Sequence, residues 1–300
     1  MILKQAFGHA CELLTANSIE DASLEAELLL RHVLEIDQVQ LYLGLNRELS
    51  PKQEATYWHI IARRLKGEPS AYITGHREFY GLDFHVGPSV LIPRPETELL
   101  VEKAINLTEN SPISTIAEIG TGCGAIAITL ALNLPGAKIY AADISAPALK
   151  VALLNCQRHG VADIICLLQG DMLDPLPEPV DLIIANLPYV KESELAQTTL
   201  GNFEPLLALN GGKDGLEKVY KLCHQVVNKL CPQGSLLLEI GQWQAKPVVA
   251  LLHSLFPSAR IEVAKDLAGI ERLVSVRLTQ NSLDAKLSKE LCFKRKTSFE

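Results

Sequence analysis

From about residue 115 onward, short apolar runs alternate with stretches whose apolar residues recur at helical spacing. Runs that are apolar on both faces are typical of parallel strands, because helices cover both sides of a parallel sheet. Chains that alternate strand and helix form doubly wound α/β sheets with right-handed crossovers. We therefore expect a Rossmann-like sheet, in which the last two runs could form an antiparallel edge. The expected strands lie at 116–119, 139–142, 164–168, 181–185, 235–240, 259–264 and 272–278.

Before this region, the first 75 residues contain helical patterns only, so we expect a small all-helical domain there. Ser50 is a good candidate for a helix N-cap, because Pro51 suits the first helical position and Gln53 completes a capping box. This pattern predicts a helix that begins at residue 51.

An earlier helix is also expected in the same domain. It would begin at Ser18 or Asp21, since both residue types can cap the exposed amides of a first turn. It would run to about Leu34 and would place Leu24, Leu28 and Val33 among its apolar positions.

The length of the chain, 300 residues, exceeds the usual size of one domain, so a large and a small domain are expected. Polar and apolar residues alternate after Tyr80 and Gly81, which predicts a short hairpin between the two. The expected division is a helical domain at 1–75, a hairpin linker at 76–92, a sheet domain at 93–278 and a polar tail at 279–300.

Composition narrows the class of protein. The formal charge of −7 and the pI of about 5.7 argue against a dedicated nucleic-acid binder, which usually has a basic face. The seven cysteines are scattered without a C-x-x-C pair, as is typical of reduced thiols in the cytoplasm. No His, Cys and Asp residues have the spacing of zinc ligands. The sequence also has no signal-peptide pattern and no apolar run long enough to span a membrane. We expect a cytoplasmic protein without bound metal.

A glycine-rich turn follows the first expected strand, and its glycines let the backbone approach a nucleoside ligand closely. Asp143 ends the next strand, where a carboxylate can accept hydrogen bonds from ribose hydroxyls. Such an acid serves NAD and S-adenosylmethionine equally, so these two features leave the cofactor open. Asp171 and Met172 end the third strand, where an adenine could receive a hydrogen bond and apolar cover, although ordinary packing explains Met172 equally well. The turn consists of Gly120, Thr121, Gly122, Cys123 and Gly124.

The fourth strand ends in Asn186, Leu187, Pro188 and Tyr189. Pro cannot continue a central strand, so the chain turns at the edge of the sheet where ligands bind. The nitrogen of a planar amide or aromatic amine is a poor nucleophile, because its lone pair is delocalised. The Asn186 side-chain oxygen and the Leu187 carbonyl could orient such a nitrogen and favour charge developing on it, with Tyr189 as a stacking wall. We therefore favour transfer of a methyl group from a sulfonium to nitrogen.

Taken together, these motifs resemble those of the release-factor glutamine N5-methyltransferases, the HemK/PrmC family. The family's Asn-Pro-Pro-Tyr motif corresponds to residues 186–189, and the resemblance extends over roughly residues 20–278. The stretches that support it, besides Asp143, lie at 67–69, 72–75, 91–98, 118–124, 202–205, 208–216, 238–241 and 266–269.

The resemblance implies S-adenosyl-L-methionine as methyl donor and a peptide chain release factor as protein substrate. The methylated atom would be the side-chain amide nitrogen of the glutamine in that factor's Gly-Gly-Gln loop. The glycine turn, Asp143, Asp171, Met172 and Asn186 would line the cofactor. Residues 186–189 would hold the glutamine amide as the catalytic and substrate-binding motif, and the helices of 1–75 would help to dock the factor. Family members usually have Trp or another large residue in place of Met172.

Other interpretations remain open. Leu187 stands where the family has Pro, so the chain could bind the cofactor but transfer poorly, since Leu loses the fixed φ and adds an N–H. A sister family methylates a glutamine of a ribosomal protein, and the sheet motifs separate the two poorly. DNA amino-methyltransferases share the motif but need base flipping and a target-reading domain, against which the helical N-terminus and the acidic charge argue. A nicotinamide-dependent dehydrogenase is the least favoured interpretation.

Overall fold

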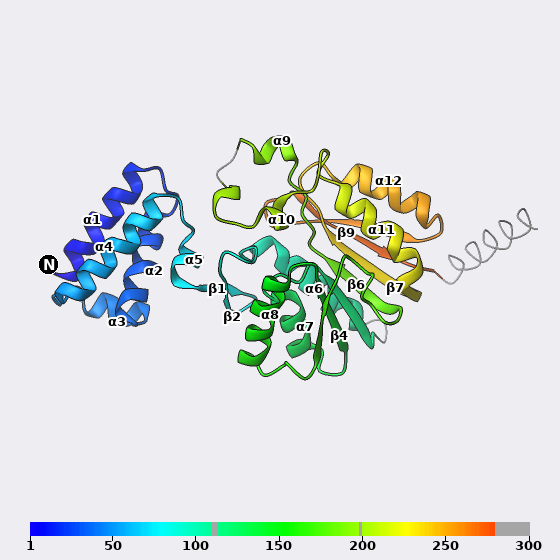
Figure 1. The fold of residues 1–300 in the computed structure, drawn as a ribbon, viewed down its shortest axis with the longest axis horizontal. Coiled ribbons are helices and arrows are strands. Elements are labelled where there is room, and N and C mark those ends of the chain that lie inside the picture. Colours follow the sequence, from blue (N-terminus) through cyan, green and yellow to red (C-terminus); the bar gives the residue numbers. More distant parts are fainter. Residues whose placement is uncertain (110–112, 198–199, 280–300) are drawn as a thin grey trace, which may run out of the picture. The chain divides into compact units, whose positions relative to one another are not determined.

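The protein is described by a computed structural model that covers residues 1–109, 113–197 and 200–279 (Figure 1). Its internal contacts divide it into two compact units, Met1–His76 and Arg77–Glu300, and each is considered by itself. Within the described ranges, no helix is long and apolar enough to cross a membrane. The expected polar tail lies, apart from its first residue, outside the described residues.

The N-terminal unit is helical, as expected, and its core forms where α1, α2 and α4 meet. Tyr57 is fully buried there, and its hydroxyl donates to the Ala26 carbonyl at 3.1 Å. The predicted capping box is confirmed: the Gln53 amide donates to Ser50 Oγ at 3.2 Å, and the Ser50 amide donates to Gln53 Oε1 at 3.0 Å. The helices are α1 (Leu3–Ala16), α2 (Ala22–Leu34), α3 (Gln38–Leu43), α4 (Pro51–Leu65) and α5 (Ser70–Thr74).

Helix α2 corrects two details of the sequence prediction. The helix follows Asp21, but that residue has a left-handed φ of 50° and its side chain caps no backbone amide. Leu24 and Leu28 are 61% and 40% exposed, because a different stripe, which includes Leu29 and Leu30, packs into the core. The helix has apolar residues on more than one side, so the pattern did not identify the side that packs.

The second unit begins with the predicted hairpin, formed by β1 (His76–Phe79) and β2 (Leu82–His85). Phe79 and Phe84 are buried and meet edge to face, with ring centroids 6.2 Å apart. The hairpin is joined to the sheet domain through Asn155, a fully buried side chain on α8 (Ala146–Arg158). Asn155 exchanges hydrogen bonds with the backbone of His85 at 2.8 and 2.9 Å and donates to the Cys123 carbonyl at 2.8 Å.

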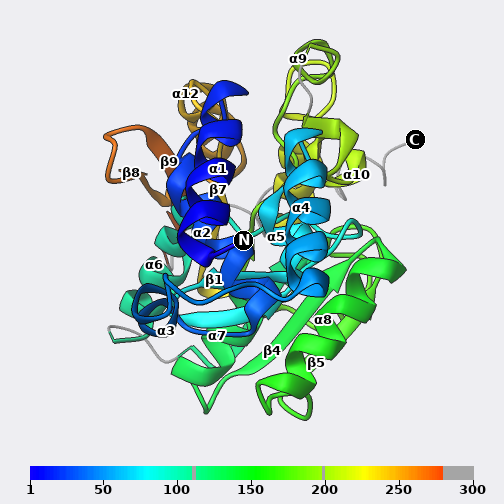
Figure 2. The same cartoon turned by 90° about the vertical axis from the view of Figure 1, so that its left-hand side faces the viewer.

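The sheet is Rossmann-like, as predicted, with strand order β5-β4-β3-β6-β7-β9-β8. The first five strands in this order run parallel, and β9 is antiparallel to both β7 and β8, which confirms the antiparallel edge. In Figure 2, β8 and β5 lie at opposite edges. The strands are β3 (Thr115–Ile119), β4 (Lys138–Asp143), β5 (Ile165–Gln169), β6 (Val180–Ala185), β7 (Leu230–Glu239), β8 (Arg260–Lys265) and β9 (Glu271–Arg277).

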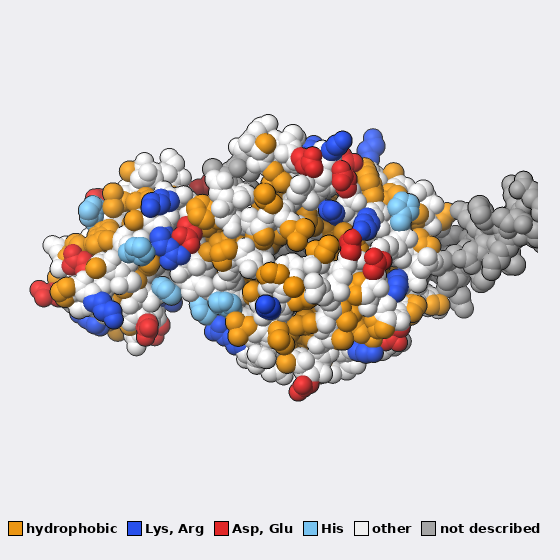
Figure 3. Space-filling model, viewed as in Figure 1, with side chains coloured by type: hydrophobic (Ala, Val, Ile, Leu, Met, Phe, Trp, Pro, Cys, Tyr) orange, Lys and Arg blue, Asp and Glu red, His pale blue; other side chains and the backbone are white. Residues whose placement is uncertain are grey.

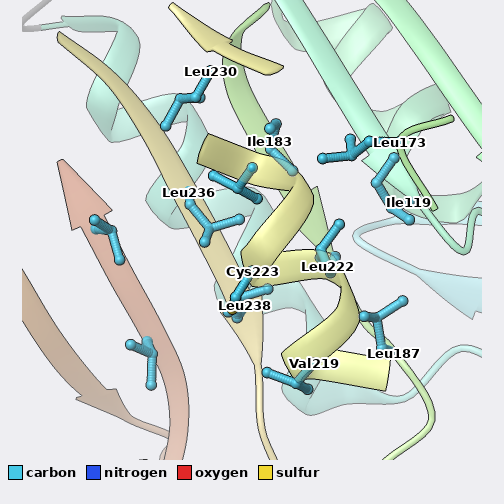
Figure 4. Close-up of a cluster of buried hydrophobic side chains, with 14 of the residues drawn as sticks. Ile119, Leu173, Ile183, Leu187, Val219, Leu222, Cys223, Leu230, Leu236 and Leu238 are labelled. Carbon is cyan, nitrogen blue, oxygen red and sulfur yellow. The ribbon is translucent and has the colours of Figure 1, made fainter. Parts of the chain in front are cut away.

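Helices cover both faces of this sheet, which explains why its central strands are almost wholly apolar. On one face, α11 packs its Leu222 and Cys223 against Leu236 and Leu238 of β7 (Figure 4). The alternate residues of the strands point to the other face, which α7 and α8 cover. The remaining elements are η1 (Pro95–Thr97), α6 (Glu98–Glu109), α7 (Ala125–Asn133), α9 (Glu192–Leu195), η2 (Leu200–Asn202), α10 (Leu206–Leu209), α11 (Glu217–Lys229) and α12 (Ala245–Leu255).

The order of the strands positions the site. The chain moves from β3 to β4 and β5 on one side, then returns to β6 on the other side of β3. In such sheets, ligands bind at the carboxyl ends of the strands where the direction of winding changes. The glycine turn after β3 and the Asn186 segment after β6 therefore meet at this edge.

Asn155→Ala is expected to lower the free energy of unfolding by about 2–4 kcal/mol, because it removes three hydrogen bonds of a buried side chain. Urea denaturation measures the change. The control is Asn133→Ala, which removes one hydrogen bond, from an exposed side chain to the Thr129 carbonyl, and should cost less than about 1 kcal/mol. Equal losses in the two variants would contradict a structural role for Asn155.

Candidate active site

A cavity of about 200 Å³ opens at the carboxyl ends of β3, β4, β5 and β6. The segments at 89–97 and 205–208 complete its walls. On the face of the second unit that Figure 3 shows, apolar side chains gather over the middle of that unit. The residues predicted from the sequence that line the cavity are Gly120, Thr121, Gly122, Cys123, Asp143, Asp171, Met172, Asn186, Leu187 and Pro188; Gly124 and Tyr189 are not among its lining residues.

The glycine turn passes close to the Asn186 segment. A Cβ atom at Gly120 would lie 3.4 Å from the Asn186 carbonyl oxygen, and the backbone there has a φ of +77°. Gly124 has another role, because a Cβ atom there would lie 3.1 Å from Ile128 Cδ1 and 3.4 Å from Ala152 Cβ. Gly124 therefore lets α7 begin close against α8, and it shapes the turn without facing the cavity.

Asp143 fixes the turn to the end of β4. Its Oδ2 accepts a hydrogen bond from the Gly122 amide at 2.9 Å, and its Oδ1 accepts one from the Ser145 amide at 2.8 Å. Burial raises the pKa of Asp143, and these backbone hydrogen bonds act in the opposite direction. A carboxylate has about four acceptor positions, so Asp143 retains capacity for ligand hydroxyls.

Glu118 opens the stretch 118–124 that supports the family resemblance and lines the cavity, but the sequence analysis gave it no site role. It is 2% exposed, and its Oε2 accepts hydrogen bonds from Thr121 Oγ1 at 2.6 Å and from the Ala127 amide at 3.0 Å. Burial raises its pKa to about 8. The signal in the sequence is an acidic residue inside an apolar strand directly before a glycine turn.

The end of β5 contributes Asp171 and Met172. Asp171 forms an ion pair with Lys221 of α11, and both side chains are well exposed. Met172 has a left-handed φ of 53°, lines the cavity and also packs against the core of the sheet domain. Met172 thus borders the cavity and fills space in the core, and its role as cover for an adenine stays a prediction.

Asn186 is held through its amide nitrogen. Its Nδ2 donates to Thr97 Oγ1 at 3.1 Å, and Thr97 Oγ1 donates to Glu239 Oε2 at 2.7 Å. Thr97 and Glu239 are 6% and 4% exposed and lie far from Asn186 in sequence. The sequence analysis placed Thr97 and Glu239 in two of the stretches that support the family resemblance, 91–98 and 238–241, but gave neither residue a role of its own.

Hydrogen bonds with neighbouring segments hold the backbone that follows Asn186. The Val190 amide donates to the Leu209 carbonyl at 3.1 Å, and the Gly211 amide donates to the Val190 carbonyl at 2.8 Å. Gln244 Nε2 donates to the Tyr189 carbonyl at 3.1 Å. The Tyr189 ring lies against Gly241, where an added Cβ atom would be 3.0 Å from Tyr189 Cδ2. This ring is thus directed toward the loop after β7.

An ion pair joins two of the cavity walls. Arg94 Nη2 lies 2.5 Å from Glu204 Oε2, and Glu204 Oε1 also accepts a hydrogen bond from the Ile92 amide at 3.1 Å. Glu204 is only 3% exposed, so the segment before η1 and the segment before α10 are firmly connected. Among the described residues, no group of His, Cys, Asp and Glu side chains is arranged to hold a metal ion.

Comparison with known proteins covers nearly the whole chain. Residues 5–75 match the family model described as PrmC N-terminal domain, and residues 95–208 match that described as Methyltransferase small domain. The release factor glutamine methyltransferase of Moorella thermoacetica is 42% identical over 91% of this chain and 97% of that protein. The release factor glutamine methyltransferase of Koribacter versatilis is 41% identical over 91% of this chain and 98% of that protein.

Among solved structures, a methyltransferase from Pyrococcus furiosus is similar to this chain with a TM-score of 0.51. The sequences are 17% identical, and the match covers 74% of this chain and 98% of that one. At this level of identity, the similarity concerns the fold alone.

Glu118→Gln is expected to change how stability depends on pH. A carboxyl group whose pKa is raised in the folded state stabilises it fully below its unfolded pKa of about 4.5, and this stabilisation is lost as pH rises through about 8. The free energy of unfolding of the unaltered protein should therefore fall relative to that of the variant between about pH 5 and pH 8.5, by a few kcal/mol.

Urea denaturation at several pH values measures this difference. Glu102→Gln, which alters an exposed carboxyl group on α6, is the control and should follow the unaltered protein throughout. A constant difference between Glu118→Gln and the unaltered protein would show that Glu118 does not titrate in this range.

Proposed function

The chain belongs to the release factor glutamine methyltransferase family, and we propose how its site carries out the reaction. The enzyme transfers a methyl group from S-adenosyl-L-methionine to the side-chain amide nitrogen, N5, of a release-factor glutamine. We infer that this glutamine belongs to the Gly-Gly-Gln loop of the factor and that residues 186–189 receive it. One observation carries the proposal: the Asn186 amide has its nitrogen bound to Thr97, which leaves its oxygen for a ligand in the cavity.

The cavity suits S-adenosyl-L-methionine in charge and in shape. The buried Glu118 and the half-buried Asp143 place two carboxyl groups beside the glycine turn, and within the described structure both accept hydrogen bonds from uncharged groups. A cationic ligand would compensate this arrangement electrostatically. Asp143 would hold the ribose hydroxyls, and Asp171 and Met172 would border the adenine. When bound, this cofactor supplies a methyl group that is activated by its sulfonium sulfur.

The substrate amide requires orientation more than a base. Asn186 Oδ1 and the Leu187 carbonyl would accept the two N–H groups of the glutamine amide and fix its plane. As positive charge develops on the nitrogen during transfer, both hydrogen bonds become stronger, which stabilises the transition state. The proton on nitrogen becomes acidic only after transfer, so no side chain has to remove it beforehand.

Leu187 replaces the proline of the family motif, and its packing supports retained activity. The side chain is 4% exposed and belongs to the core cluster, beside Val219 and Leu222 of α11 (Figure 4). It also lies close to the glycine turn, since a Cβ atom at Gly120 would be 3.5 Å from Leu187 Cδ2. We propose that this packing fixes the Leu187 carbonyl, as the proline ring does in the family motif.

Residues 1–75 are proposed to help dock the release factor, while residues 93–278 carry the catalytic site. Two consecutive helices of this unit, α2 and α3, expose five large apolar side chains that a bound protein could cover. They are Leu24, Leu28, Val39, Tyr42 and Leu43.

We propose a cytoplasmic location and no direct contact with nucleic acid. All cysteines in the described ranges have free thiols, which is typical of a reducing compartment. The net charge of −7 is unfavourable for binding a phosphate backbone.

Incubation with S-adenosyl-L-methionine and an unmethylated release factor should add one methyl group to the glutamine of the Gly-Gly-Gln peptide, as mapped by mass spectrometry. Asn186→Ala should lower the rate roughly 100- to 1,000-fold, because it removes an acceptor that acts on developing charge. Asn133→Ala, on the exposed side of α7, is the control and should retain the rate. Full activity of Asn186→Ala would contradict the proposed site.

If the protein binds the cofactor but methylates no release factor, Leu187→Pro separates two explanations. Recovered transfer would identify a member impaired by Leu187. Continued inactivity would indicate another substrate, such as a ribosomal protein, and that substrate can be tested with the same assay.

A further inference from the structure

Behind Asn186, two buried side chains form a connected series of hydrogen bonds. Asn186 Nδ2, Thr97 Oγ1 and Glu239 Oε2 follow one another at 3.1 and 2.7 Å. They come from three separate elements: the end of β6, the short helix η1 and the end of β7. In a low-dielectric interior, a buried series of hydrogen bonds whose members are all satisfied holds them in one defined arrangement.

Chemistry sets the direction of this series. An ionised Glu239 can only accept hydrogen bonds, so the single hydroxyl proton of Thr97 must point toward it. Thr97 Oγ1 then has only lone pairs to offer to Asn186. Of the two ends of the Asn186 amide, only the NH₂ group can donate to these lone pairs, which leaves Oδ1 on the side away from Thr97.

We propose that Thr97 and Glu239 are positioning residues that hold the Asn186 amide in one of its two orientations, with the oxygen toward the substrate. This inference rests on the proposed function, in which the substrate presents N–H groups to Asn186. In the reversed orientation, the Asn186 NH₂ group would face the NH₂ group of the substrate, and two donors cannot form a hydrogen bond. The reversed amide would therefore fail to orient the nucleophile.

The surroundings of Glu239 decide its charge. Arg272 of β9, Glu96 of η1 and the Tyr189 hydroxyl influence it electrostatically, and Arg272 is itself paired with Asp266 at 3.0 Å. Burial raises the pKa of Glu239 to about 7, while the hydrogen bond from Thr97, the charge of Arg272 and a direct hydrogen bond with the Asn186 side chain act against this rise. A protonated Glu239 can donate to Thr97, which allows the whole series, and with it the Asn186 amide, to reverse.

The rate should therefore depend on pH in a predictable direction. The ionised fraction of Glu239 rises with pH through about 7, so kcat should rise over the same range. Gln does not ionise, and its amide can either donate to Thr97 or accept from it. The kcat of Glu239→Gln should therefore be lower and should lack this dependence on pH. If Glu239→Gln keeps the rise in kcat near pH 7, another group causes the rise and the role of Glu239 is refuted.

The decisive experiment compares Thr97→Val, Thr97→Ser and Thr129→Val on a release-factor substrate. Thr97→Val keeps the shape but removes the hydroxyl, and kcat should fall roughly 10- to 100-fold, by analogy with residues that orient metal ligands through a hydrogen bond. Thr97→Ser restores a hydroxyl and should recover most of the rate. Thr129→Val is the matched control, because Thr129 is also fully buried but donates to the Ala125 carbonyl within α7.

Binding of S-adenosylhomocysteine, measured by calorimetry, separates positioning from loss of structure. Thr97→Val should bind it within about threefold of the unaltered protein, since the substitution keeps the shape of a side chain that lines the cavity and leaves the glycine turn and Asp143 unchanged. The inference is refuted if Thr97→Val has the kcat of Thr129→Val, or if its kcat and its affinity fall together. It also fails if Thr97→Ser does not recover activity. An unaltered protein that methylates no glutamine would instead refute the proposed function.

Discussion

The parallel pairing of β3 with β4 on one side and with β6 on the other is the constraint on which the site depends. Ala117 lies opposite Tyr140 in β4 and opposite Ile183 in β6, so the three strands end at the same level of the sheet. This alignment brings the glycine turn so near the Asn186 segment that a Cβ atom at Gly120 would be in van der Waals contact with it. The buried apolar strands thus determine where polar groups far apart in the sequence meet.

Much of this arrangement could be predicted, because its signals are local. Strand and helix alternation gave the sheet, and the Ser50 capping box gave the start of α4. The glycine turn and Asp143 could be placed at strand ends, since parallel strands share one direction. The ends of the strands were predicted less closely. Strand β5 begins at Ile165, one residue later than expected, because Ile164 is exposed and does not pair with β4.

What could not be predicted depends on contacts between distant side chains. No spacing in the sequence connects Thr97 with Glu239, which the fold brings to 2.7 Å. The direction of the Tyr189 ring is likewise set by the loop after β7 and by Gln244. The packing side of α2 depends on α1 and α4, which the pattern of α2 alone does not contain. Fold class follows from periodicity, whereas hydrogen-bond partners follow from tertiary packing.

The loop at 210–215 behind Pro188 and Tyr189 leaves no room for side chains at two of its glycines. A Cβ atom at Gly211 would lie 2.8 Å from the Pro188 carbonyl oxygen, and one at Gly215 would lie 2.4 Å from the Tyr189 carbonyl oxygen. The two backbones are therefore fitted to each other without side chains between them. The motif at 186–189 and the loop at 210–215 therefore have to be inherited together. A recombinant that took the motif from one ancestor and this loop from another would join surfaces that had never been selected together, although both ancestors were active.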